Sequence, residues 1–143
     1  MRTASWIVLV LVGGLTLLGA LGSASFGYWS SEWGQDQIGS VSLHDLAADH
    51  EDVATAIRAR RGTAAAFAAA FATLFVWIIV GPYRRGEVWS WWAILCGTLV
   101  YVLISAVRIP FLGTRAGVDV AGIMLAAVVV GLLLDVKRLR AAG

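Results

Sequence analysis

Two charge-free stretches joined by a short turn decide the fold of this chain. Residues 63–81 read TAAAFAAAFATLFVWIIVG, residues 82–87 read PYRRGE, and residues 88–107 read VWSWWAILCGTLVYVLISAV. A helix needs about 20 apolar residues to cross the ~30 Å of hydrocarbon in a bilayer, and each stretch approaches or reaches that length. Because the turn is so short, the two helices must be antiparallel neighbours. The sequence therefore predicts an integral membrane protein.

The composition supports a membrane environment and argues against a nucleic-acid partner. Of the 143 residues, 59% are hydrophobic and only 14% are charged, with a mean hydropathy of +0.81. Soluble domains carry about 25% charged residues. The net charge of +2 comes from basic residues at the ends of apolar segments, where they signal topology and contact lipid headgroups. The lipid bilayer is thus the first predicted partner, and the abundance of Ala, Gly and Arg over Lys indicates a bacterial genome.

The predicted fold is all-α: an integral membrane four-helix bundle with an extra amphipathic surface helix in the first connection. Short apolar segments flanked by charges or turn residues define the spans. The predicted elements of this single transmembrane domain (1–143) are spans at about 4–27, 63–81, 88–108 and 116–136, and an amphipathic helix at about 42–61.

The first span has two interpretations. A basic start at Arg2, an apolar middle and the small residues 22–25 resemble a signal peptide. The apolar run is longer than that of a usual signal peptide, which favours a helix retained in the mature protein.

The predicted amphipathic helix begins with a capping pattern. Ser42 followed by Asp45 resembles a capping box. Apolar residues and His50 recur at helical spacing on one side, whereas Asp45, Asp49 and Asp52 form an acidic stripe on another. We expect this helix to lie on the membrane surface or across the mouth of the bundle.

The fourth span is short and places an acid near the membrane. Only fifteen uncharged residues separate Asp119 from Asp135, about 22 Å of helix, so one aspartate should lie at or within the edge of the hydrocarbon. Asp135 has Arg138 three residues later for a partner in the headgroups. Asp119 is therefore the predicted buried acid, with Arg108 or Arg115 as its partner. The pair Asp119–Arg108 can be an ion pair that joins two helices, or a ligand or proton site.

The orientation is predicted from the basic residues that flank the spans. One side carries six and the other five Lys or Arg residues. The compact Arg84–Arg85 turn and the basic C-terminal tail immediately flank spans, which favours both termini in the cytoplasm. The predicted location is the inner membrane, crossed several times.

The reactive side chains do not assemble into a recognisable catalytic or metal site. His44 and His50 are six residues apart on different sides of the predicted helix, too few for a zinc site without further ligands. No CxxC, phosphate-binding loop or HExxH motif occurs. Cys96 lies in an apolar helix, where a small packing residue is expected. We predict no metal, no cofactor and no catalytic residues.

The turn of the hairpin carries a family resemblance. Residues 83–92 read YRRGEVWSWW and lie between the second and third of four predicted spans. This string and layout resemble DoxX-like small bacterial membrane proteins. The resemblance implies a membrane subunit of a quinone-linked oxidoreductase or of a redox-stress assembly. No cofactor-binding motif carries over, and the long acidic outer connection departs from the compact loop expected of that group.

Two functions of different classes follow from these observations. The first is a non-catalytic integral membrane subunit or accessory protein of a larger membrane complex, bound to other membrane subunits or to itself. The alternative is a small quinone- or lipid-binding membrane protein associated with an oxidoreductase, with Asp119, Arg108 and His50 as its ligand-binding residues.

Overall fold

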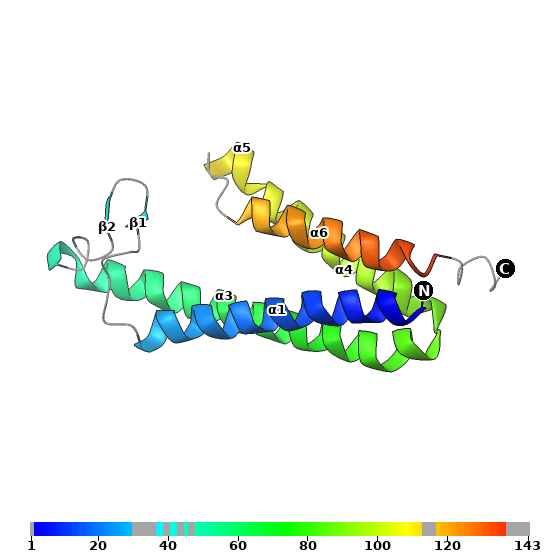
Figure 1. Ribbon diagram of the computed structural model, residues 1–143. Helices are drawn as coiled ribbons and strands as arrows, with labels where there is room; N and C mark the ends of the chain where they lie inside the picture. Colours follow the sequence, from blue (N-terminus) through cyan, green and yellow to red (C-terminus); the bar gives the residue numbers. More distant parts are fainter. Residues whose placement is uncertain are drawn as a thin grey trace. The chain divides into compact units, whose positions relative to one another are not determined.

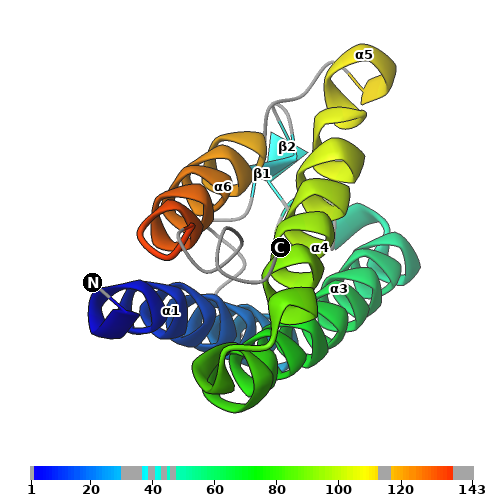
Figure 2. The same cartoon turned by 90° about the vertical axis from the view of Figure 1, so that its right-hand side faces the viewer.

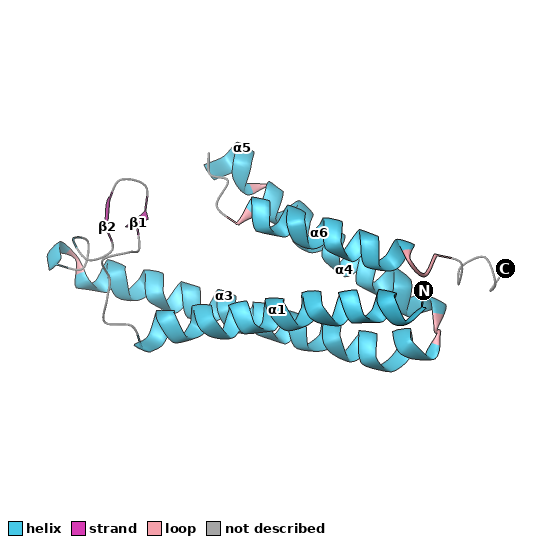
Figure 3. Ribbon diagram, in the orientation of Figure 1, coloured by secondary structure: helices cyan, strands magenta, loops and turns pink. Residues whose placement is uncertain are grey.

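Helices make up nearly all of the computed structural model, as Figures 1 and 3 show. The structure describes residues 2–29, 37–38, 41–42, 45, 48–112 and 117–136. The elements in chain order are α1 (Arg2–Trp29), β1 (Gln37–Ile38), β2 (Val41–Ser42), α3 (Glu51–Ile78), η2 (Ile79–Tyr83), α4 (Val88–Ala106), α5 (Arg108–Leu112) and α6 (Val118–Leu133). The prediction of a helical protein with several long apolar helices is confirmed.

Three of these helical segments are long and apolar enough to cross a membrane. They are Ala4–Ser25 with 22 residues, Glu51–Tyr83 with 33 residues and Val88–Phe111 with 24 residues. The fourth apolar helix, α6, has 16 residues, about 24 Å at 1.5 Å per residue. It is shorter than the predicted span 116–136 because Gly117 adopts a positive φ of 81° at its start, and the helix ends at Leu133.

The predicted amphipathic helix at 42–61 has helical residues at Asp45, Ala48 and Asp49, but its start at Ser42 and its separation from the second span are wrong. Val41 and Ser42 form β2, which pairs antiparallel with β1, so Ser42 is not a helix cap. Helix α3 begins at Glu51 and runs without interruption through the start of the predicted second span. A lone Gly62 costs a helix only about 1 kcal/mol, too little to end it. The charged segment 51–61 and the apolar segment that follows are therefore one helix.

A proline lies near the end of the second span and another near the end of the third, and the long α-helix ends before each of them. Pro82 lies inside η2, a π-helical segment that carries the helix on to Tyr83. Pro110 has no N–H to donate to the carbonyl of Ala106, and α4 ends at that residue before the short α5. The third predicted span, 88–108, accordingly consists of α4, Val107 and the first residue of α5.

The chain packs as two compact units. The first comprises Met1–Leu15 and Thr73–Gly143, and the second comprises Thr16–Ala72. In the first unit, α4 and α6 lie side by side along their lengths, as Figures 1 and 2 both show. The most deeply buried large side chains of this unit are Leu9, Ile79, Tyr83, Ile94 and Leu132.

Glycines allow close approach at several contacts inside the first unit. A Cβ at Gly13 would lie 2.6 Å from Val76 Cγ2 and 3.0 Å from Phe75 Cδ1. A Cβ at Gly131 would lie 2.8 Å from Leu9 Cδ2. These positions let α1 pack closely against the end of α3 and against α6, because the side chains of Val76 and Leu9 fill the space that a glycine leaves open.

The second unit joins the C-terminal half of α1 to most of α3. The phenol of Tyr28 lies over Gly62, where a Cβ would overlap the ring. The guanidinium of Arg58 donates to the Tyr28 carbonyl oxygen over 3.5 Å. Ala20, Ala54, Ala65 and Ala72 are the buried apolar residues of this unit, and their small size suits helices that approach closely.

Candidate functional site

The best-defined polar arrangement in the first unit is a chain of buried hydrogen bonds between three elements. Ser5 Oγ on α1 lies 2.6 Å from Tyr83 Oη on η2 and donates to the carbonyl oxygen of Gly131 on α6 over 2.7 Å. A serine hydroxyl has one proton, so Tyr83 donates to Ser5. Ser5 is fully buried and Tyr83 is 1% exposed. We call Ser5, Tyr83 and Gly131 the buried cluster.

A second buried hydrogen bond secures the same end of α6. The indole Nε1 of Trp91 on α4 donates to the carbonyl oxygen of Leu132 over 3.2 Å. The last carbonyls of a helix have no partner within the helix. Here two consecutive carbonyls near the end of α6 receive donors from two different helices, and that of Leu132 also accepts from the Asp135 N–H over 3.1 Å. The C-terminal end of α6 is thereby bound inside the protein.

This arrangement explains which aspartate is buried. Asp135 follows the anchored end of α6 and is 8% exposed, whereas Asp119 is exposed in the first turn of α6. The aspartate packed inside the protein is thus Asp135, and not Asp119 as expected; which of the two lies within the hydrocarbon stays a prediction. The physical reason is that Ser5 and Trp91 hold the C-terminal end of α6 between α1 and α4.

The three predicted ligand-binding residues lie at different places in the fold. His50 is exposed, and its carbonyl oxygen accepts a hydrogen bond from the Ala54 N–H at the start of α3. Arg108 is exposed at the start of α5. Within the described parts of the chain, no ion pair joins Arg108 to Asp119. His50 belongs to the second unit and the other two to the first, so a shared ligand site stays a prediction.

Other predicted features fall outside the described residues. Among them are Arg115, one candidate partner of Asp119, as well as His44 and the basic residues of the C-terminal tail. In the portion of the chain that the structure covers, no three metal-ligating side chains come together. Cys96 is a free thiol exposed on the surface of α4.

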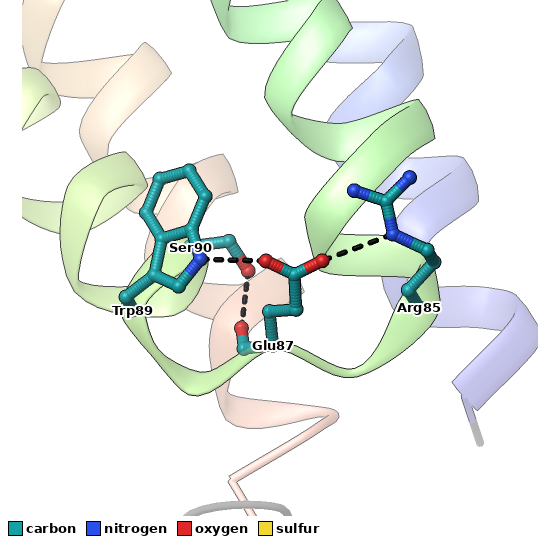
Figure 4. Close-up of polar contacts among 4 residues, drawn as sticks. All are labelled: Arg85, Glu87, Trp89 and Ser90. Carbon is teal, nitrogen blue, oxygen red and sulfur yellow. Dashed lines mark hydrogen bonds and ion pairs between the residues drawn. The ribbon is translucent and has the colours of Figure 1, made fainter.

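The hairpin turn holds a second, exposed polar arrangement, shown in Figure 4. Glu87 lies between Arg85 and Trp89. Its Oε1 accepts from Arg85 Nε over 2.9 Å and its Oε2 accepts from Trp89 Nε1 over 2.6 Å. The indole hydrogen bond, followed by that of the guanidinium, holds the pKa of Glu87 below its ordinary value. We call Arg85, Glu87 and Trp89 the turn cluster.

Next to the turn cluster, Arg84 makes a different contact. Its guanidinium carbon lies 5.1 Å from the centroid of the Trp6 ring of α1, within the range of a cation–π interaction. The backbone that presents these residues turns at Gly86, whose φ of 98° is accessible chiefly to glycine. Glu87 then stands at the N-cap position of α4 without a side-chain capping hydrogen bond, and Ser90 Oγ donates to its carbonyl oxygen.

Sequence reasoning identified the turn but not the buried cluster. Ser5 and Tyr83 are 78 residues apart in the chain, and a serine in an apolar helix is ordinary. The only local signal is that Gly131 interrupts a run of larger apolar residues. Comparison of the chain with protein-family models, with curated proteins and with solved structures gives no match. The resemblance to DoxX-like proteins therefore stays a prediction.

Proposed function

We propose that this chain is an integral protein of the bacterial inner membrane that acts as a non-catalytic subunit or accessory protein of a larger membrane complex. The proposed topology is four crossings with both termini in the cytoplasm. The resemblance of the hairpin turn to DoxX-like proteins favours a complex of the redox type.

The observation that carries the membrane location is the apolar exterior of the long helices. Large apolar side chains are exposed by more than half their surface on four helices. They include Leu11, Leu15 and Leu18 on α1, Phe67, Leu74 and Trp77 on α3, Leu103 and Ile104 on α4, and Ile123 on α6. A water-soluble protein rarely exposes apolar surface on this scale. Lipid is the solvent that suits these surfaces.

The anchored end of α6 supports a fourth crossing despite its length. Backbone polar groups in hydrocarbon must be satisfied within the protein. Ser5 and Trp91 donate to Gly131 and Leu132, so this end of the helix does not need water. A 16-residue helix that is satisfied in this way can end below the headgroups.

A non-catalytic role is supported by the contacts of the polar side chains in the first unit, which join helices or stabilise the turn. Ser5, Tyr83 and Trp91 hold helices together, and Glu87 ties the turn to Arg85 and Trp89. These groups do structural work, while the exposed helix faces offer surface for other membrane subunits.

Two measurements test the membrane location and topology. Alkaline carbonate should leave the chain in the membrane pellet while peripheral proteins from the same membranes are released. In a Cys96→Ser background, Gln35→Cys should react with an impermeant thiol reagent in intact cells, and Ala142→Cys only after the membrane is opened. Extraction by carbonate would overturn the membrane assignment, and the reverse labelling pattern would overturn the orientation.

Gentle detergent extraction followed by mass spectrometry tests the proposed role. We expect the chain to co-purify with other membrane proteins, or with further copies of itself, in a fixed stoichiometry. Recovery as a lone monomer would contradict a subunit role. Recovery with a retained quinone that Asp119→Asn or Arg108→Gln releases would favour the alternative function instead.

A further inference from the structure

The two adjacent arginines of the hairpin turn have different electrostatic partners. Arg85 shares its charge with Glu87 across a 2.9 Å contact, and the second oxygen of that carboxylate is occupied by the Trp89 indole. Figure 4 shows both contacts on the same carboxylate. Arg85 is therefore a neutralised cation, and Glu87 has no oxygen left unused.

Arg84 keeps its positive charge and has a fixed position. It is exposed, and among the described residues no carboxylate pairs with it. Its guanidinium is held over the Trp6 ring. A guanidinium carries five N–H donors in a planar fork that matches a phosphate, and the contact with the Trp6 ring positions this group next to α1.

The surroundings of Arg84 suit a lipid better than a soluble anion. Trp89 and Trp92, at the start of α4, are both exposed by more than half, as tryptophans at the headgroup level are. On α1, Ile7 and Leu11 are exposed and four residues apart, so they lie on one side of the helix. They provide an apolar stripe that leads away from the Trp6 level along α1.

We propose that Arg84, held against the Trp6 ring, binds the phosphate of an anionic phospholipid of the cytoplasmic leaflet, with an acyl chain along Ile7 and Leu11. Anionic lipids give this leaflet its negative surface potential. The guanidinium supplies charge and paired donors, and the apolar stripe supplies the contact that inorganic phosphate would lack. This inference rests on the membrane location proposed above.

The neighbouring arginine provides the matched control for a test. The full-length protein is purified in a neutral detergent, and its melting temperature is measured with added phosphatidylglycerol or phosphatidylcholine. Native protein and Arg85→Gln should both be stabilised more by phosphatidylglycerol. Arg84→Gln should lose most of this preference, with an affinity about fivefold weaker, as expected for one basic residue near an anionic surface.

Two further measurements complete the test. One asks whether the charge of Arg84 is enough without the shape of its guanidinium, and the other asks whether free phosphate can replace the lipid. Arg84→Lys keeps the charge without the planar fork of donors, and should lose at least half of the preference. Inorganic phosphate should give no Arg84-dependent stabilisation. Equal losses in Arg84→Gln and Arg85→Gln, full retention in Arg84→Lys, or an equal effect of phosphate would each overturn the proposal.

Failure of this inference and failure of the proposed membrane location give different results. A chain released by carbonate refutes the membrane location itself. A chain that stays in the membrane and shows no preference for phosphatidylglycerol refutes only the lipid site. If Arg84→Gln does not fold, Trp6→Leu provides the second variant, because it removes the aromatic ring while both arginines remain. The preference should then fall, and an unchanged preference would overturn the role of Trp6.

Discussion

The buried cluster and the turn cluster contain similar polar contacts in very different surroundings. The buried cluster joins neutral groups, with Ser5 fully buried and Tyr83 1% exposed. The turn cluster joins charged groups, and the Arg85 side chain is 68% exposed. The first connects segments from opposite ends of the sequence, whereas the second connects residues within two positions of Glu87.

The difference teaches that charge is a poor guide to which contact holds this protein together. An exposed ion pair contributes only about 0–1 kcal/mol, because solvent screens it. A buried hydroxyl or carbonyl that loses its partner incurs a desolvation cost of about 1–3 kcal/mol. We therefore expect the neutral, buried cluster to determine the packing of the first unit and the turn cluster to adjust it slightly.

The largest loss of stability should come from adding a methyl group at Gly131, the glycine of the buried cluster. Gly131→Ala places a methyl group against Leu9, which is fully buried and cannot easily move. The expected loss in unfolding free energy is about 1–3 kcal/mol, measured by titration with denaturing detergent in mixed micelles.

Gly122→Ala on the same helix is the control for this substitution. Nothing lies within 4 Å of a Cβ built there, and alanine favours helix by up to about 1 kcal/mol. Its stability should be unchanged or slightly higher. Equal effects of the two alanines would show that α6 is not packed against α1 at Gly131.

A smaller loss should follow from removing the central hydroxyl of the buried cluster. Ser5→Ala takes one hydrogen bond each from Tyr83 and Gly131, and side-chain hydrogen bonds in membrane proteins contribute about 0.6 kcal/mol on average and up to about 1.7. In a double-mutant cycle, Tyr83→Phe should be less harmful when Ser5 is already alanine. The same unfolding assay provides all four free energies.

Ser105→Ala is the matched control for the removal of a hydroxyl. Ser105 Oγ donates to the Tyr101 carbonyl within α4 and joins no second helix. We expect little change in stability. Strictly additive effects of Ser5→Ala and Tyr83→Phe would mean that the two hydroxyls do not act together.

The smallest effect, and the only pH-dependent one of the three, should come from Glu87→Gln. Because the pKa of Glu87 is lowered in the folded protein from its ordinary value of 4.5, its stabilisation is present above that value and is lost as the pH falls through the lowered pKa. Melting temperatures of native protein and variant should therefore differ slightly near neutral pH and converge in acid.

The indole of Trp89 offers a way to shift this pH dependence. Trp89→Phe removes the hydrogen bond that lowers the pKa of Glu87 most, so the loss of stability in acid should be smaller and should be complete at a higher pH. A difference between native protein and Glu87→Gln that stays constant down to about pH 3 would exclude the carboxylate as its source.

Length and hydrophobicity were enough to predict the helical class and the hairpin. The charge-free stretches at 63–81 and 88–107 both became helix, and the turn between them holds the arginines and tryptophans that the sequence placed there. Local patterns failed where two signals competed. The capping pattern at Ser42 gave way to strand pairing, and Gly62 was too weak a signal to divide α3.

The site could not be predicted because it depends on contacts between distant segments. Spacing along the chain favoured Asp119 as the buried acid because Arg138 follows Asp135, but the hydrogen bonds from Ser5 and Trp91 anchor the other end of α6, next to Asp135. Likewise, Arg84 and Arg85 are indistinguishable in sequence. Their different partners, Trp6 and Glu87, come from different elements.

The unbroken helix from Glu51 to Tyr83 has a mechanical consequence. Its 33 residues measure about 50 Å, which exceeds the ~30 Å of hydrocarbon by several helical turns. In the membrane topology proposed above, with Tyr83 near one membrane surface, the charged beginning of α3 would extend beyond the other. A pull or twist on that extension would reach the Pro82 turn through continuous backbone hydrogen bonds, which two helices separated by a loop could not transmit.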